Sequence, residues 1–406
     1  MTLNNYFKQS ILSIAVLSSF SANAACDIAS GFCEQVALEG GSKTEVEFAN
    51  YVESMVGADN ELGDLLQAAS ATPGGAKALA NELLATGDGA AVLSSLNTTF
   101  LTQKVIQNRI FTMRNQDRMG NFNFGWNTWV SLVGSNTSTD NDFGVDDVDS
   151  VSAGLMIGSD KYLVDDRSYL GYSVAYVHSN SQVDRSDKEV NIDKFQFSMY
   201  AGMAFENLYI DSLFNIGRSS ASSERSIGDW SGFTGVTKSE ADFNLLESGF
   251  KVVAGYHYET EYVNIKPSIA YNVQWISQDD YNEEGSDASL RYDRQDYQPT
   301  FIETSLDVYK DIDTDYGIVT PRLTVTYMDD RSNERIHENV QLALDNPNNP
   351  SFSALEGSKV GGDRMSLTSS VSLENENMWS VNALLGYETS DEMNSLFGTV
   401  NITKRF

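Results

Sequence analysis

The chain has 406 residues, with 27 Lys and Arg against 57 Asp and Glu, which gives a formal net charge of −30. So acidic a chain would repel a phosphate backbone, and we therefore expect no nucleic-acid partner. Sustained apolar sequence is confined to the N-terminus, so we expect no transmembrane helix in the mature chain. A membrane protein without such helices has to be a closed β-barrel, because lipid offers no other way to satisfy backbone polar groups.

Residues 1–25 are predicted to be a signal peptide. Lys8 supplies the positive charge, residues 11–20 form the apolar core, and Ala22-Asn23-Ala24 is a small-residue cleavage motif. The apolar run is too short to span a bilayer as a helix. We therefore expect export across the inner membrane of a Gram-negative cell.

Cys26 and Cys33 are the two cysteines of the chain, and both follow the predicted cleavage site. In an oxidising compartment this placement favours a small disulfide loop. The alternative is that Cys26 is a lipidated first residue. The preceding Asn23-Ala24-Ala25 lacks the large aliphatic residue that lipoprotein signals usually carry.

Residues 26–94 are predicted to form a short, alanine-rich helical segment. Amphipathic spacing at helical period occurs in several pieces, which are separated by breaks such as Pro73-Gly74-Gly75. Residues 95–114 predict one longer helix with an apolar stripe that includes Val105 and Ile110. Its polar positions include Lys104, Arg109 and Arg114. Residues 95–121 would then comprise this helix and a linker to the first strand.

From residue 122 onward the hydrophobic pattern has period two, which predicts β-strands. In the last stretch, Val400 and Ile402 alternate with Thr399 and Asn401, and the chain ends on Phe406. Soluble sandwiches also contain such strands, but an even number of them is typical of an outer-membrane barrel. We predict twelve, at residues 124–133, 151–162, 169–178, 193–205, 208–218, 243–258, 262–275, 298–309, 318–327, 364–374, 378–388 and 393–406.

The apolar row of each strand is expected to face lipid, and the polar row to line a wet lumen. Phe197, Val273 and Leu385 should then lie on the exterior. Four charged residues fall on lumen rows and are interpreted as groups that keep the lumen wet, with a specific site as the alternative: Glu247, Lys251, Lys266 and Arg322.

The connections between these strands alternate in length. Five are brief, at residues 163–167, 206–207, 259–260, 311–315 and 375–376, whereas 135–149, 180–192, 219–242, 277–297 and 328–363 are long and mostly acidic. The last of the outer connections, around Ser390-Asp391, is the exception and is short. This sorting predicts a periplasmic rim and an extracellular rim, with both barrel termini on the periplasmic side. The acidic run 140–149 is interpreted as a solvated outer loop, and the alternative is bridging to lipopolysaccharide through divalent cations.

This pattern resembles the β-domain of autotransporters, the translocator part of type V secretion systems, over about residues 122–406. The matching pieces are Trp126-x-x-Trp129, residues 152–160, residues 170–179, Met199-Tyr200-Ala201, Ile265-x-Pro267, Thr320-Pro321 and Lys404-Arg405-Phe406. The resemblance implies an all-β, twelve-stranded antiparallel transmembrane barrel with an α-helix in the pore. It also implies a monomer in the outer membrane, in contact with lipid and lipopolysaccharide. Phe406 would be the assembly signal read by the barrel-assembly machinery, with periplasmic chaperones as further partners.

Two departures from the family pattern qualify this resemblance. Family members that cut their own linker carry paired asparagines in the pore helix, whereas the nearest pair here is Gln107-Asn108. We therefore predict that the helix stays attached. Only residues 26–94 precede the helix in the mature chain, so there is little cargo to display.

Motifs for catalysis and metal binding are absent from the sequence. There is no Gly-x-Ser-x-Gly, no Gly-rich phosphate loop and no His-Glu-x-x-His, and the three histidines are scattered. Residues 311–317 differ from a calcium loop because glycine stands at the seventh position and no glutamate at the twelfth. We therefore expect no cofactor, no metal and no enzymatic activity.

Three functional hypotheses follow. The first is an outer-membrane translocator that threads or displays its own short N-terminal segment at the cell surface. The second is a structural outer-membrane barrel, or a narrow pore, without a working passenger. The third, an enzyme with a lumen-facing site, has the least support in the sequence.

Overall fold

The structure is a computed structural model, and it describes residues 26, 31–55, 61–84, 89–118, 125–140, 147–163, 167–183, 188–228, 236–346, 349, 351–353, 357, 359–375 and 379–405. The predicted signal peptide, residues 119–124 and Phe406 lie outside the described residues. The signal peptide and the assembly signal therefore stay predictions.

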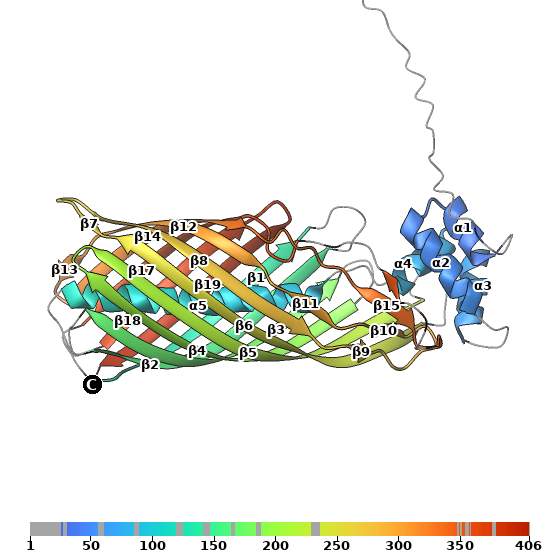
Figure 1. Cartoon of the computed structure of the whole chain (residues 1–406), viewed down its shortest axis with the longest axis horizontal. Coiled ribbons are helices and arrows are strands. Elements are labelled where there is room, and N and C mark those ends of the chain that lie inside the picture. The colour runs from blue at the N-terminus through green and yellow to red at the C-terminus, as the bar shows by residue number, and fades with distance from the viewer. Residues whose placement is uncertain are drawn as a thin grey trace, which may run out of the picture.

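Twelve antiparallel strands close into a barrel (Figure 1), as the sequence predicts. The ring closes where the first strand pairs with the last, from Asn127 opposite Arg405 to Thr139 opposite Met393. The strands are β1 (Asn127–Thr139), β2 (Val148–Tyr162), β3 (Ser168–Val183), β4 (Lys188–Phe205), β5 (Leu208–Ile227), β6 (Thr237–Tyr256), β8 (Asn264–Gln278), β12 (Thr300–Tyr309), β14 (Gly317–Asp330), β17 (Arg364–Glu374), β18 (Trp379–Thr389) and β19 (Met393–Arg405).

Side chains along these strands alternate between an exposed apolar row and a buried small or polar row. In β19, Val400 and Ile402 are each 45% exposed, whereas Asn401 and Thr403 are buried. Period two in the sequence therefore predicts correctly which residues lie on the outer face of the barrel. Phe197 and Leu385 are exposed as predicted.

The prediction for Val273 is wrong, because this side chain is only 4% exposed. It occupies the outward row between Tyr271 and Trp275, and its register partner on β6 is Phe250. These three aromatic side chains are exposed. A short valine among longer outward-pointing rings is shielded by them, so a correct facing does not guarantee exposure.

Among the described residues, five helices precede the barrel in sequence: α1 (Phe32–Leu38), α2 (Lys43–Met55), α3 (Glu61–Ala71), α4 (Gly75–Leu83) and α5 (Ala90–Arg118). The first four form a small bundle at one end of the barrel, and α5 runs through the lumen (Figure 1). The α5 helix is longer at both ends than the predicted 95–114. In the described part of the chain, no helix combines the length and apolar character needed to cross a membrane.

A glycine motif explains where α1 ends. Gly40 has a φ of +80°, which favours glycine, and its N–H donates to the Ala37 carbonyl (3.2 Å). The Gly41 N–H donates to the Val36 carbonyl (2.9 Å). This pair of bonds is a Schellman motif, which satisfies the last carbonyls of the helix and turns the chain back toward α2.

Two of the five predicted long loops, at residues 180–192 and 219–242, are largely strand, and a third, at residues 135–149, is strand at both of its ends. β3 and β4 continue until only residues 184–187 separate them, and β5 and β6 each have 20 residues. The sequence missed these extensions because strands beyond the lipid need no apolar outer row, as in Ser219-Ser220-Ala221-Ser222-Ser223. The other two long connections carry a four-stranded sheet of β9 (Tyr281–Asn282), β10 (Leu290–Tyr292), β15 (Asn339–Leu342) and β16 (Phe352–Ser353). Short strands β7 (Tyr258–Glu259), β11 (Gln295–Tyr297) and β13 (Ile312–Thr314) pair with barrel strands.

The four-helix bundle shares one apolar core with these strand extensions. Phe48 and Leu79 of the bundle cluster with inward side chains of the extended strands such as Ile192 and Ala221, and with Leu290 of the small sheet. The bundle is therefore packed onto the long-loop end of the barrel.

A pair of Leu→Arg substitutions tests which surface meets lipid. Leu385 (60% exposed) lies near the middle of β18, and Leu344 (47% exposed) lies beside the small sheet. Leu385→Arg is expected to lower the free energy of unfolding in lipid vesicles by about 2–4 kcal/mol, because it places a charge in hydrocarbon. Leu344→Arg is the matched control and should change it by no more than about 0.5 kcal/mol. Equal effects in urea titrations would contradict the membrane assignment.

Candidate functional site: the helix-filled lumen

Helix α5 lies off-centre in the lumen because one of its faces is apolar. Val105, Ile106 and Ile110 belong to a buried cluster that includes Trp129 of β1 and Tyr200 of β4. The other members of this cluster come from the helix itself and from β1–β5, β18 and β19. Burial of this stripe holds the helix against one half of the wall. Its polar face is turned to lumen-facing charges.

A buried ion pair fixes the middle of the helix to the wall. The Arg109 guanidinium donates to both oxygens of Asp160, from Nε to Oδ2 (2.7 Å) and from Nη2 to Oδ1 (2.8 Å). Asp160 also accepts from Asn127 Nδ2 (3.0 Å) and the Tyr200 hydroxyl (2.8 Å), and Arg109 Nη1 donates to Thr403 Oγ1 (3.1 Å). The two charged side chains are almost fully buried. Such a bidentate, fully bonded pair is geometrically specific and costly to break.

A second buried pair lies nearer the bundle. Lys194 and Glu247 form an ion pair, and Lys194 Nζ also donates to the Ser95 carbonyl (2.9 Å). Glu247 accepts from Thr99 Oγ1 (2.9 Å) and from Ser219 Oγ (2.8 Å). The first turns of α5 are thus bound to strands β4, β5 and β6 through charge-assisted bonds.

A third group joins Lys104 to the opposite side of the barrel. Lys104 pairs with Glu388 and lies 3.8 Å from the centre of the Phe397 ring. Arg364 Nη1 donates to Glu388 Oε1 (3.1 Å) and to Asn97 Oδ1 (3.0 Å). Cation–π contact and ion pairing therefore act together on this side of the helix.

The remaining predicted lumen residues lie toward the end of α5. Arg114 pairs with Asp211. Lys266 Nζ donates to Asn115 Oδ1 (3.0 Å), and Arg322 Nη2 donates to Asn108 Oδ1 (2.7 Å). Lys251 instead forms an ion pair with Glu303, which is also a residue of the barrel wall (2.5 Å).

All seven charged residues singled out from the sequence therefore lie in the lumen. Three of them belong to α5, and three of the four wall residues, Glu247, Lys266 and Arg322, contact the helix. The sequence analysis missed their counter-charges: Asp160, Lys194, Asp211, Glu303 and Glu388. Each of these is a charged residue on the buried row of its strand. A search for charges on the polar row of every predicted strand would have found them.

The bundle is bound to the mouth by its own set of contacts. The Tyr51 hydroxyl of α2 donates to Asp345 Oδ2 (2.9 Å) and accepts from the Leu342 N–H (3.1 Å). Burial raises the pKa of Tyr51 to about 12, so the hydroxyl remains protonated near neutral pH. Arg225 pairs with Glu283 beneath α4 and donates to the Glu82 carbonyl.

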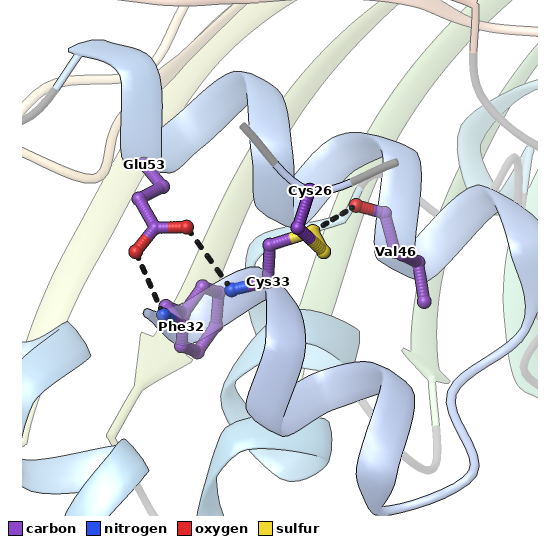
Figure 2. Close-up of a disulfide and its surroundings, with 5 residues drawn as sticks. All are labelled: Cys26, Phe32, Cys33, Val46 and Glu53. Carbon is purple, nitrogen blue, oxygen red and sulfur yellow. Dashed lines mark hydrogen bonds between the residues drawn. A yellow bond between two sulfur atoms is a disulfide. The ribbon is translucent and has the colours of Figure 1, made fainter. Parts of the chain in front are cut away.

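A disulfide between Cys26 and Cys33 ties the start of the described chain to α1 (Figure 2). Glu53 of α2 caps α1, because its carboxylate accepts from the N–H groups of Phe32 (2.8 Å) and Cys33 (3.2 Å). Cys33 is fully buried, and its Sγ lies 3.5 Å from the Val46 carbonyl oxygen. The Glu53 cap therefore joins α1 and α2, and the disulfide adds Cys26 to this unit.

No group of three or more potential metal ligands occurs among the residues that the structure describes. The geometry of the lumen instead matches a plugged barrel, in which ion pairs and one apolar stripe hold a helix in place.

Comparisons with known proteins agree with this geometry. The family model described as "Autotransporter beta-domain" matches residues 128–386. No curated protein matches the sequence significantly. Among solved structures, the chain is similar to the translocator domain of the autotransporter NalP from Neisseria meningitidis, at 14% identity and a TM-score of 0.56, covering 76% of this chain and 98% of that one. It is also similar to the β-domain of the Bordetella autotransporter BrkA, at 15% identity and a TM-score of 0.50, covering 70% and 100%. At these identities the likeness shows a shared fold.

An Asp160→Asn substitution tests the ion pair between Arg109 and Asp160. It is expected to lower the free energy of unfolding by about 3–5 kcal/mol, because Arg109 keeps a buried charge without its counter-charge. The double variant Arg109→Met/Asp160→Asn removes both charges and should be more stable than Asp160→Asn alone. Asp329→Asn is the control, since its partner Arg331 is exposed at the surface, and should cost at most about 1 kcal/mol. Urea unfolding in vesicles, followed by tryptophan fluorescence, measures all three. Similar losses of unfolding free energy for Asp160→Asn and Asp329→Asn would contradict a stabilising role for the Arg109–Asp160 pair.

Proposed function

This chain belongs to the autotransporter β-domain family, and we propose that it carries its own residues 26–94 through the barrel and holds them at the cell surface. The family places the protein in the outer membrane. The long-loop end is then the extracellular end, and both termini of the barrel lie at the periplasmic end.

One observation carries the proposal: a continuous helix connects two opposite ends of the barrel. The bundle lies at the long-loop end, and α5 runs from it through the lumen to the end where β1 begins (Figure 1). Because β1 starts at the far end, the helices α1–α4 lie at the opposite end of the barrel from it. A chain made as one polypeptide reaches that arrangement by passage through the pore.

The proposed mechanism is physical and involves no bond chemistry. The closed wall satisfies the backbone hydrogen bonds of every strand in lipid, so the barrel can hold a polar lumen. Residues 26–94 cross this lumen before the bundle folds. The lumen charges then bind α5 and close the passage. Lipid, lipopolysaccharide, periplasmic chaperones and the barrel-assembly machinery are the partners that this route requires, and a single chain suffices.

The second candidate function is a structural barrel without a working passenger. The observation that favours it is the tight docking of the bundle, through Tyr51, Arg225 and the shared apolar core. A segment that is bound to its own barrel has less surface available for a partner.

An inserted epitope tests whether the bundle is outside. Protease shaving alone is ambiguous, because a folded bundle resists cleavage on either side of the membrane. A short epitope inserted between α2 and α3 should bind antibody on intact cells. The same epitope in the turn between β4 and β5, at Glu206-Asn207, is the matched control and should bind only after the outer membrane is permeabilised. If the α2–α3 epitope also needs permeabilisation, surface display is ruled out.

Conductance distinguishes the plugged translocator from a narrow pore. In planar bilayers, deletion of residues 26–118 should raise single-channel conductance at least several-fold, because α5 fills most of the lumen. Deletion of residues 26–84 alone leaves α5 in place and should change conductance little. A full-length chain that already conducts as well as the larger deletion would favour the narrow-pore function.

A further inference from the structure

The lumen contains a cavity that the helix does not fill. Its volume is about 140 Å³, and it lies between α5 and the wall of β5, β6, β8, β12, β14 and β17, with one lining residue each from β18 and β19. Its lining extends along the helix from Phe100 to Arg114, about 20 Å at the rise of an α-helix. The apolar stripe of α5 holds the helix against the opposite wall, which leaves this space open. It is large enough for several water molecules or a small ion.

The charged side chains that line this cavity carry an excess of positive charge. Counting Glu388, which pairs with Lys104 from outside the lining, there are five cationic side chains and four carboxylates. The net charge around the cavity is therefore positive, whereas the net charge of the whole chain is negative. The lining charges are Lys104, Arg114, Lys251, Lys266 and Arg322 against Asp211, Glu303 and Asp307.

Arg322 brings an unused donor to this cavity. Its side chain is 7% exposed, and its Nε lies 3.9 Å from Asp307 Oδ1, too far for a hydrogen bond. This Nε has no hydrogen-bond partner among the described residues, and neither does that of Arg114. A buried donor without an acceptor costs about 1–3 kcal/mol, so native structures usually supply a water or an ion.

Lys266 contacts the same aromatic ring of α5 as the Arg322 guanidinium. The Lys266 Nζ is 4.6 Å from the centre of the Phe111 ring, and the Arg322 Cζ is 3.9 Å from it. Two cationic groups thus share one aromatic ring on α5. A planar guanidinium and a nearby ammonium suit an oxyanion, which accepts from both through separate oxygens.

We propose that this cavity binds a small oxyanion, a carboxylate or a phosphate, between Arg322 and Lys266. The outer end of the cavity is closed by Phe100, which packs edge-on against Phe301 at 5.4 Å. Arg114 at the other end stays partly exposed, so the ion enters from the periplasmic end. The site exists only once α5 is in place, because α5 supplies part of its lining.

Calorimetric titration of the full-length protein in detergent tests the site. Sodium phosphate and sodium acetate are the two probes, each compared with sodium chloride at equal ionic strength. We expect saturable binding of one oxyanion per chain. Arg322→Gln should weaken it at least about tenfold, since a charge-assisted bond is lost. Arg331→Gln, an exposed arginine outside the lumen, is the matched control and should keep the wild-type affinity.

The outcomes separate clearly. Binding of both probes supports a general oxyanion site, and binding of phosphate alone narrows the ligand to phosphate. Absence of saturable binding in the wild-type protein, or equal affinity in Arg322→Gln, overturns the proposal. Circular dichroism checks that each variant folds. If Arg322→Gln does not fold, Lys266→Gln takes its place, with the same expected loss of affinity.

Discussion

The requirement that every backbone polar group in lipid be paired within the protein governs this structure. Twelve strands meet it by closing on themselves, with β1 paired to β19 over thirteen residue pairs. Closure makes two surfaces of opposite character, and period two in each strand assigns side chains to them. The twelve strands enclose a wide lumen. Helix α5 occupies most of it, and an apolar stripe and several ion pairs hold the helix in place.

The ion pairs have a different role from the apolar stripe. Apolar contacts with β1–β5 hold the helix to one side but tolerate sliding along its axis, because they are not directional. The Arg109–Asp160 pair fixes both the rotation and the height of the helix, because Arg109 reaches its carboxylate in one register only. The wall residues Lys194 and Glu247 add to this through their bonds to Ser95 and Thr99 of the helix. Buried charge pairs of this kind contribute specificity of position more than net stability.

Much of the fold follows from the sequence, and the failures have identifiable causes. The outward rows were predictable because lipid demands apolar side chains at Phe197 and Leu385. Beyond the lipid that demand ends, so the outer halves of β5 and β6 have no such signal. The cationic side chains of α5 were recognisable as polar positions, but their partners are far away in sequence: Asp160 is 51 residues from Arg109, and Glu388 is 284 from Lys104. The docking of the bundle was unpredictable for the same reason, since it joins Tyr51 to Asp345.

The long strands β5 and β6 have a mechanical consequence for the bundle. About ten residues are enough for a tilted strand to cross the hydrocarbon, so a strand of 20 residues extends well past it. The strand residues beyond the hydrocarbon extend the barrel wall, and the helices α1–α4 pack on this extension through a continuous apolar core. A folded unit packed on a rigid wall in this way keeps one orientation relative to the bilayer, and always turns the same side away from it.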